Sequence, residues 1–147
     1  MKDRFEAFLT GVTVCYKYIQ RIKHMEMTEL GLKGTHLTCL FFLSKYPQGL
    51  TATQLSQLCE EDKASVSRTV ADLRLRGYIG VSEKHYRAPL LLTDEGKAVA
   101  LRLEPLISRW VLQGGDGLTE QQREIFYDCL TQISENLRRK LEETEDD

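Results

Sequence analysis

Long apolar runs are missing from this 147-residue sequence, and no stretch approaches the roughly 18 apolar residues that a membrane-spanning helix requires. Residues 1–6 (MKDRFE) also lack the apolar segment of a secretory signal peptide. The four cysteines are widely separated and form no C-x-x-C pair. We therefore expect a cytoplasmic protein with reduced thiols and without a membrane partner.

Motifs for catalysis are equally scarce. The sequence contains no glycine-rich nucleotide loop, no nucleophile elbow and no carboxylate pair beside a histidine. His36 and Cys39 share a helix face at a spacing of three residues, which leaves a zinc site as an alternative. We expect no catalytic residue, no metal and no cofactor, and we do not expect an enzyme.

Charge is nearly balanced overall, at a formal −2, but it is unevenly distributed. Residues 63–87 hold six lysines and arginines against two acidic residues, whereas residues 135–147 hold three against six. A locally basic face on an acidic protein is what attraction to phosphate requires, and the overall charge then decides little. The alternative is that these cations are solvated helix residues without a partner.

Helical periodicity dominates the first half of the chain. Apolar residues recur at steps of three and four from Phe5 to Ile19, which predicts a first helix that ends near Met27. The segment LTCLFFL at 37–43 predicts a buried second helix, because it is almost entirely apolar. Pro47 follows closely and predicts the end of that helix.

Two capping signals come next. Thr51 and Gln54 have the spacing of a capping box and predict a short third helix. Asp62 is placed to cap a fourth helix that begins at residue 63, and Gly77 is placed to end it.

A β-hairpin is predicted after the fourth helix. Short apolar segments at 78–81 and 90–93 flank a charged loop, and Pro89 must stand at the start of a strand or on an edge. Thr93 is placed to cap a fifth helix, in which Pro105 predicts a kink or a break.

The sequence GGDG at 114–117 predicts a turn before the last helix. Thr119 and Gln122 form a second capping box there. The last helix carries an apolar face that runs from Phe126 to Leu141 at steps of three and four. The fold class is therefore mainly α, with one small β-element.

The predicted fourth helix has two different faces. Val66, Val70 and Leu73 lie within roughly 60° of one another on a helical wheel and form a buried face. Arg68 lies on the opposite side, with Ser65 close to it. Helix, turn, helix and hairpin in this order are the layout of a winged helix-turn-helix, whose second helix enters the major groove of DNA.

The stretches GLTATQLSQLCEEDKASVSRTVADLRLRGYI and YRAPLLLTDEG resemble the multiple antibiotic resistance regulator (MarR) family. The resemblance covers residues 32–96, which it implies to be a winged helix-turn-helix lobe within one subunit of residues 1–147. Residues 1–30 and 97–145 would be a helical dimerisation region. The implied partners are a second copy of the chain, a pseudo-palindromic DNA operator and a small-molecule effector, whose binding residues are unknown.

The resemblance and the charge pattern together give a set of expected DNA contacts. The recognition helix would contribute hydroxyls and cations, and the wing would contribute cations to the minor groove. The set comprises Lys63, Ser65, Ser67, Arg68, Thr69, Arg74, Lys84, His85 and Arg87.

The resemblance implies a transcriptional repressor that a small molecule or an oxidant releases from DNA. One branch of the family senses hydroperoxides through a cysteine in the first helix, and Cys15, followed by Tyr16, is the matching candidate here. The alternative for Cys15 is a packed apolar residue. The alternative for the whole chain is a winged-helix module that binds protein and has no sequence-specific DNA binding.

Overall fold

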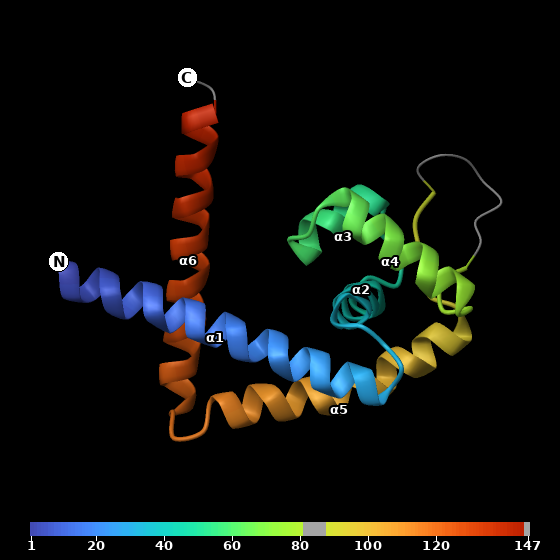
Figure 1. Ribbon diagram of the computed structural model, residues 1–147, viewed down its shortest axis with the longest axis horizontal. Coiled ribbons are helices and arrows are strands. Elements are labelled where there is room, and N and C mark those ends of the chain that lie inside the picture. Colours follow the sequence, from blue (N-terminus) through green and yellow to red (C-terminus); the bar gives the residue numbers. More distant parts are fainter. Residues whose placement is uncertain (81–87, 146–147) are drawn as a thin grey trace. The chain divides into compact units, whose positions relative to one another are not determined.

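A computed structural model describes residues 1–80 and 88–145 of the chain. The described residues form six helices, which confirms the mainly helical fold class and the predicted order of elements (Figure 1). The helices are α1 (Lys2–Glu29), α2 (Gly34–Lys45), α3 (Ala52–Cys59), α4 (Lys63–Leu75), α5 (Asp94–Gly114) and α6 (Glu120–Glu145).

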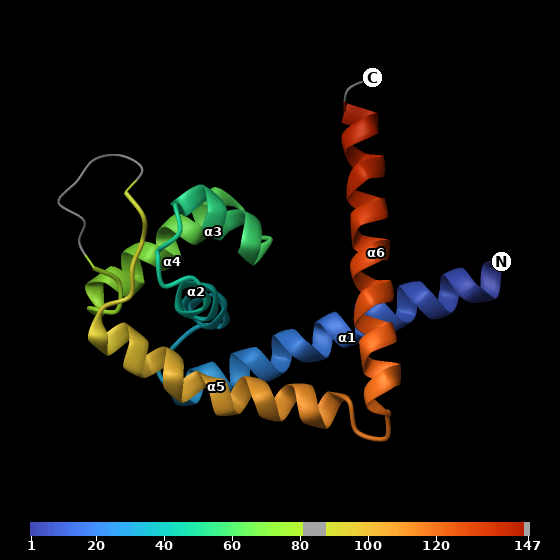
Figure 2. The same ribbon diagram turned by 180° about the vertical axis from the view of Figure 1, so that it is seen from behind.

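The chain divides into two compact units, Met1–Pro105 and Leu106–Asp147. In the first unit, α2, α3 and α4 pack against one another, and α1 packs against α2 (Figures 1 and 2). Leu40, Leu55 and Leu73, one from each of the three packed helices, are fully buried where these helices meet. This small core is what holds the helix-turn-helix together.

Short antiparallel pairings join three segments of the first unit. Leu50 pairs with Leu90, and Ile79 pairs with Leu92. The Leu90 amide donates to the Leu50 carbonyl at 2.7 Å, so the segment before α3 lies against the returning side of the hairpin. Pro89 immediately precedes the isolated bridge at Leu90, and within the described residues neither side of the predicted hairpin forms a regular strand.

The predicted helix caps are confirmed in both units. The Gln54 amide donates to Thr51 Oγ1 at 3.1 Å, and the Gln122 amide donates to Thr119 Oγ1 at 3.2 Å. In each box the glutamine side chain accepts from the threonine amide in return, at 2.9 Å and 2.8 Å. These side chains satisfy amides that the first turn of a helix leaves without a partner.

The junction between the hairpin and α5 depends on a close backbone approach. Thr93 Oγ1 accepts from the Gly96 amide at 3.0 Å, and its hydroxyl donates to the Gly77 carbonyl. A Cβ atom on Gly96 would overlap the Tyr78 carbonyl. Only glycine therefore fits at this position, which explains the glycine of the LTDEG sequence.

Of the kink or break predicted at Pro105, the break is absent, because α5 continues through the proline as one helix. Proline removes a single intrahelical hydrogen bond, and the apolar face of α5 carries on across it from the buried Leu103 to the half-buried Leu106.

The second unit consists of the end of α5, the turn at 115–117 and α6. No residue of α6 whose side chain is described is buried. Of the helices within residues 1–80 and 88–145, none has both the length and the apolarity needed to cross a membrane.

Candidate nucleic-acid interface

The turn between α3 and α4 is held by side-chain hydrogen bonds. Ser56 Oγ donates to the Glu61 carbonyl at 2.7 Å, and Glu60 adopts a left-handed backbone with φ 51°. Asp62 Oδ1 then accepts from the Ser65 amide at 2.8 Å, which confirms the predicted cap of α4. The turn therefore fixes where the first residues of α4 lie relative to α3.

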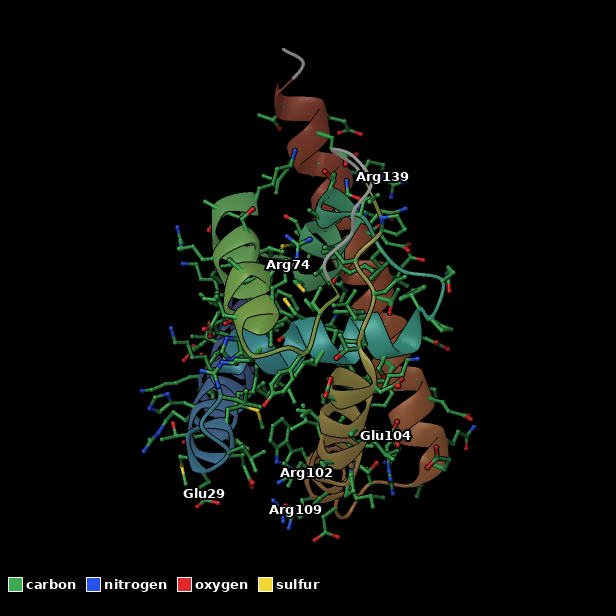
Figure 3. The ribbon with its side chains drawn as sticks, turned by 90° about the vertical axis from the view of Figure 1, so that its right-hand side faces the viewer. Glu29, Arg74, Arg102, Glu104, Arg109 and Arg139 are labelled. Carbon is green, nitrogen blue, oxygen red and sulfur yellow. The ribbon has the colours of Figure 1, made fainter. Side chains whose placement is uncertain are left out.

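The apolar face of α4 is buried, as predicted. Val66, Val70 and Leu73 are buried. Lys63, Ser67, Arg68 and Arg74 are exposed on the remaining surface, and Ser65 is half-buried. Figure 3 shows Arg74 extending from α4. The helix thus presents small hydroxyls and long cations from a rigid, capped element.

Thr69 departs from the prediction. It is only 7% exposed and lines a small cavity with Thr35 and Thr38 of α2. On the helical wheel, Thr69 follows Val66 by three residues and therefore turns toward α2 with that buried side chain. It is not part of the exposed face of α4.

The exposed cations of α4 have no acidic partners among the described residues. Lys63, Arg68 and Arg74 form no ion pair and no side-chain hydrogen bond within residues 1–80 and 88–145. Arg76 is the exception, because its guanidinium is paired with Asp72. Three exposed cations of α4 are therefore free to meet an external anion.

A buried histidine anchors α4 to the helix before it. His36 of α2 is 1% exposed, and its Nε2 lies 2.7 Å from Asp72 Oδ2. Its Nδ1 accepts from the Lys33 amide at 3.0 Å. Arg76 Nε donates to the same Asp72 oxygen at 3.2 Å, and Arg76 Nη1 donates to the Gly31 carbonyl at 2.8 Å. This network ties α4 to the end of α1 and the start of α2.

The hydrogen bonds of His36 define its protonation state. Burial lowers the pKa of His36, and this effect outweighs the nearby Asp72 carboxylate, which raises it. A neutral ring accepts at Nδ1 and donates at Nε2, as both contacts require. Both nitrogens are therefore occupied. Among the described residues, no cluster of three or more metal-ligating side chains is found.

The Asp72 carboxylate is stabilised in its charged form. Desolvation works against the charge, but the hydrogen bond and positive charge of Arg76 outweigh it and lower the pKa of Asp72. Sequence reasoning missed this network. The spacing of Asp72 and Arg76 by four residues was visible as a helix ion pair, whereas the approach of His36 was not.

The predicted wing contacts Lys84, His85 and Arg87 lie outside the described residues. The base of the hairpin is described on both sides, at Ile79 and at Leu90 and Leu92. Cys15 lies on α1 with its side chain exposed.

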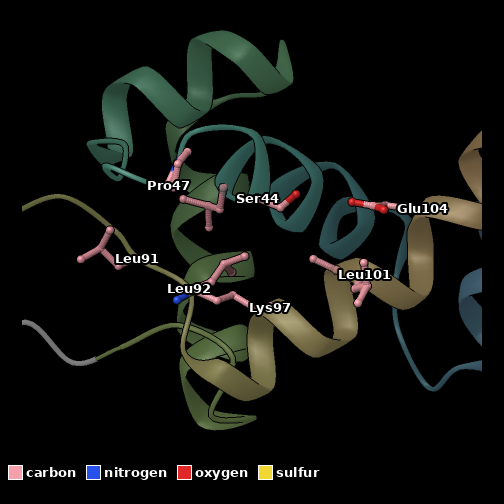
Figure 4. A pocket seen from close by; sticks show the side chains of 9 residues that line it. Ser44, Pro47, Leu91, Leu92, Lys97, Leu101 and Glu104 are labelled. Carbon is pink, nitrogen blue, oxygen red and sulfur yellow. The ribbon is translucent and has the colours of Figure 1, made fainter.

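A cavity of about 460 Å³ lies beside the lobe, within the first unit. Its walls come from α2, the returning strand segment and the first half of α5 (Figure 4). Leu91, Leu92 and Leu101 make the lining largely apolar, while Lys97 and Glu104 contribute one charge of each sign. This volume and composition are typical of small-molecule sites.

Comparisons with known proteins agree with this arrangement. A model of the MarR family matches residues 30–88. A search of curated proteins finds no match.

Several solved structures have a similar fold. A MarR/EmrR family transcriptional regulator from Acinetobacter sp. ADP1 is 18% identical with a TM-score of 0.82, over 93% of this chain and 97% of that one. A MarR-family transcriptional regulator from Silicibacter pomeroyi is 26% identical with a TM-score of 0.73, over 82% and 83%. The S. aureus MepR–DNA complex is 16% identical with a TM-score of 0.77, over 89% and 96%.

The fold and the capped, basic α4 define a winged helix-turn-helix protein. Residues 30–88 match the MarR family, and the chain shares its fold with transcriptional regulators of that family.

Proposed function

We propose that the chain is a cytoplasmic transcriptional regulator that binds a pseudo-palindromic DNA operator as a homodimer. The observation that carries the proposal is the exposed face of α4, where Lys63, Arg68 and Arg74 have no acidic partner among the described residues. Ser65 and Ser67 are small enough to let the helix backbone approach the groove. Arginine at such a position can form a bidentate pair with guanine. The wing residues Lys84, His85 and Arg87 are proposed to reach the minor groove.

The exposed apolar residues of α1 support the homodimer. Only Met27 is buried along this 28-residue helix. Phe5, Phe8 and Ile19 are among its exposed large apolar side chains. A single-chain protein rarely leaves so much apolar surface in water.

The last helix supports the same partner. Phe126, Leu130 and Leu137 of α6 are exposed and lie on one side of the helix. A second copy of this chain presents the same apolar faces, and it is the partner that we propose for α6 as for α1.

A small-molecule signal is proposed to act through the cavity between α2 and α5. Its walls include Leu91 and Leu92, which belong to the returning side of the hairpin. A ligand that binds one arrangement of these walls more tightly would shift the position of the wing. We propose repression, relieved by the signal, on the resemblance to the family.

The test begins with a selection of bound genomic fragments by the purified full-length protein. We expect enriched fragments to share a pseudo-palindrome with half-site centres about 10 bp apart. On such a fragment, Arg68→Ala should lower the ratio of specific to non-specific affinity by about 1–3 kcal/mol. Lys63→Ala should weaken binding to all sequences alike and reduce the salt dependence.

Arg102→Ala is the matched control, because Arg102 is an exposed arginine on α5 (Figure 3). It should leave the specificity ratio unchanged. If no fragment is enriched and electrophoretic shifts depend only on salt, the alternative of a protein-binding winged helix is favoured. An unchanged ratio in Arg68→Ala would mean that α4 does not read the bases.

A further inference from the structure

Two thiols meet inside the helix-turn-helix. Cys39 in α2 and Cys59 at the end of α3 have their sulfur atoms 3.9 Å apart. Cys39 is buried and Cys59 is half-buried. Cys15 and Cys129 are exposed and have no comparable sulfur contact within residues 1–80 and 88–145. The chain therefore holds one thiol pair, open to solvent on the Cys59 side, among its described residues.

The surroundings make the two sulfurs chemically unequal. The hydrogen bond from Cys39 lowers the pKa of Cys59, and the ammonium of Lys23 on α1 acts in the same direction against burial and Glu61. The same hydrogen bond and burial raise the pKa of Cys39. Cys59 therefore ionises first, while Cys39 stays protonated and donates a hydrogen bond to the Cys59 sulfur. A thiolate is the reactive form toward oxidants.

Lys23 is held in place near this pair. Its Nζ donates to Thr38 Oγ1 at 2.9 Å, one residue before Cys39. Burial lowers the pKa of Lys23, and the charges of Glu61, Cys59 and Cys39 oppose that effect. The ammonium thus faces both sulfurs from a third helix.

We propose that Cys39 and Cys59 are a redox-active dithiol, which a hydroperoxide converts into an intramolecular disulfide. The Cys59 thiolate attacks the terminal oxygen of the hydroperoxide, the O–O bond breaks, and the alkoxide or hydroxide that leaves takes up a proton. Cys59 is now a sulfenic acid. The Cys39 sulfur attacks the Cys59 sulfur, the S–O bond breaks, and the hydroxyl leaves with the thiol proton as water. Two thiols lose two electrons, and the hydroperoxide gains them.

Disulfide formation would act on α4 through the turn. A disulfide bond is about 2.05 Å long, so closing the 3.9 Å gap draws the end of α3 toward α2. Cys59 directly precedes Glu60 and Glu61, and Glu61 is held by Ser56. Asp62 follows and caps α4.

The first turns of α4 also share a small cavity with the thiols. Ser65, Val66 and Thr69 line this cavity together with Cys39 and Cys59. A shift of the thiols is therefore passed to the residues that precede and flank Arg68. The resulting loss of DNA affinity rests on the proposed function, whereas the disulfide itself does not.

The experiment uses the full-length double variant Cys15→Ser/Cys129→Ser, which retains only the proposed pair. Reduced protein is treated with hydrogen peroxide, alkylated and digested with trypsin. In the wild type the four cysteines fall in separate tryptic peptides, 5–17, 34–45, 46–63 and 124–138. We expect a linked peptide that joins 34–45 to 46–63, and we expect dithiothreitol to release it. Cys59→Ser should abolish the link, and its circular dichroism spectrum checks that it remains folded.

The second readout is affinity for a DNA fragment that the reduced protein binds. We expect oxidation to weaken binding by about tenfold and reduction to restore it, with no effect of peroxide on Cys59→Ser. Alkylation of both cysteines after peroxide, or a link that involves only Cys15 in the wild type, would overturn the dithiol. A linked peptide with unchanged DNA affinity would overturn its effect on α4. If the reduced protein binds no DNA, the proposed function fails, and the linked peptide still decides the dithiol.

Discussion

The helix-turn-helix and the last helix use similar local signals but bury very different surfaces. Both α3 and α6 begin with a Thr-x-x-Gln capping box, with hydrogen bonds of nearly equal length. Leu55 of α3 is nevertheless fully buried, while no described side chain of α6 is. Local sequence therefore forms both helices equally well, but only α3 places a fully buried side chain in the core of its own unit.

This difference assigns the two regions different sources of stability. The lobe of α2, α3 and α4 is stabilised by burial of side chains such as Leu40 and Leu73. The apolar face of α6 buries no described side chain, so in the proposed homodimer its stabilising contribution would come from contact with the second copy. Core mutations should therefore lower the free energy of unfolding of the lobe at any protein concentration. Mutations in α6 should act instead through the association of two copies.

The largest expected effect comes from the core of the lobe. Leu73→Ala should lower the free energy of unfolding by about 2–5 kcal/mol, because Leu73 is fully buried between α4 and its neighbours. Leu75→Ala is the control, since Leu75 lies two residues away on the same helix and is 88% exposed. It should change stability by no more than about 0.5 kcal/mol in urea denaturation. Equal losses in the two variants would contradict the assignment of the buried face.

The next effect concerns α6 and the second copy. Leu137→Lys should raise the dimer dissociation constant by about 30-fold or more, because it places a charge in the proposed interface. Glu135→Lys introduces the same side chain on the opposite side of α6 and should leave association unchanged. Sedimentation velocity over a range of concentrations measures both. A wild type that is monomeric at micromolar concentration would remove the dimer altogether.

The two capping boxes allow a direct comparison of the regions. Thr51→Ala should lower the free energy of unfolding of the lobe by about 1 kcal/mol, because the Gln54 amide loses its acceptor. Thr53→Ala removes an exposed threonine from the same helix and should have little effect. Thr119→Ala breaks the equivalent bond in α6 and should instead weaken dimerisation. A Thr119→Ala loss that is independent of protein concentration would mean that α6 is stable without a partner.

The smallest effect is a pH dependence of the lobe. The folded pKa of His36 lies below its unfolded value, so the unfolded state binds more protons as the pH falls. Stability should therefore be complete above pH 6.5 or so and decrease as the solution is acidified below it. The lowered pKa of Asp72 contributes stability that is lost only in more acidic solution, as the pH falls below the ordinary pKa of a carboxyl group.

Thermal unfolding of wild type and His36→Gln between pH 7.5 and 5 separates these contributions. Glutamine keeps a donor for Asp72 but does not titrate, so the variant should have the flatter pH profile. Profiles of the same slope would show that His36 is protonated as readily in the folded as in the unfolded protein.

Much of the fold was predictable because it depends on neighbours in sequence. The caps at Thr51, Asp62 and Thr119 each join residues three apart, and the buried face of α4 follows from helical periodicity. At Pro105 the same reasoning predicted a kink or a break, and the break is excluded because α5 runs through the proline as one helix. It failed at Thr69, because a position on the flank of a helix is buried or exposed according to which helix lies beside it.

The sequence alone determined the helices, their ends, the order that makes a winged helix-turn-helix, and a fourth helix with one apolar and one basic face. Only the tertiary structure decided that His36 meets Asp72, and that the Cys39 and Cys59 sulfurs lie 3.9 Å apart. Hydrophobic periodicity records which side of an element is buried, but it does not record which residue of another element lies opposite. That choice is made when the helices pack, because close packing of whole side chains fixes their relative positions.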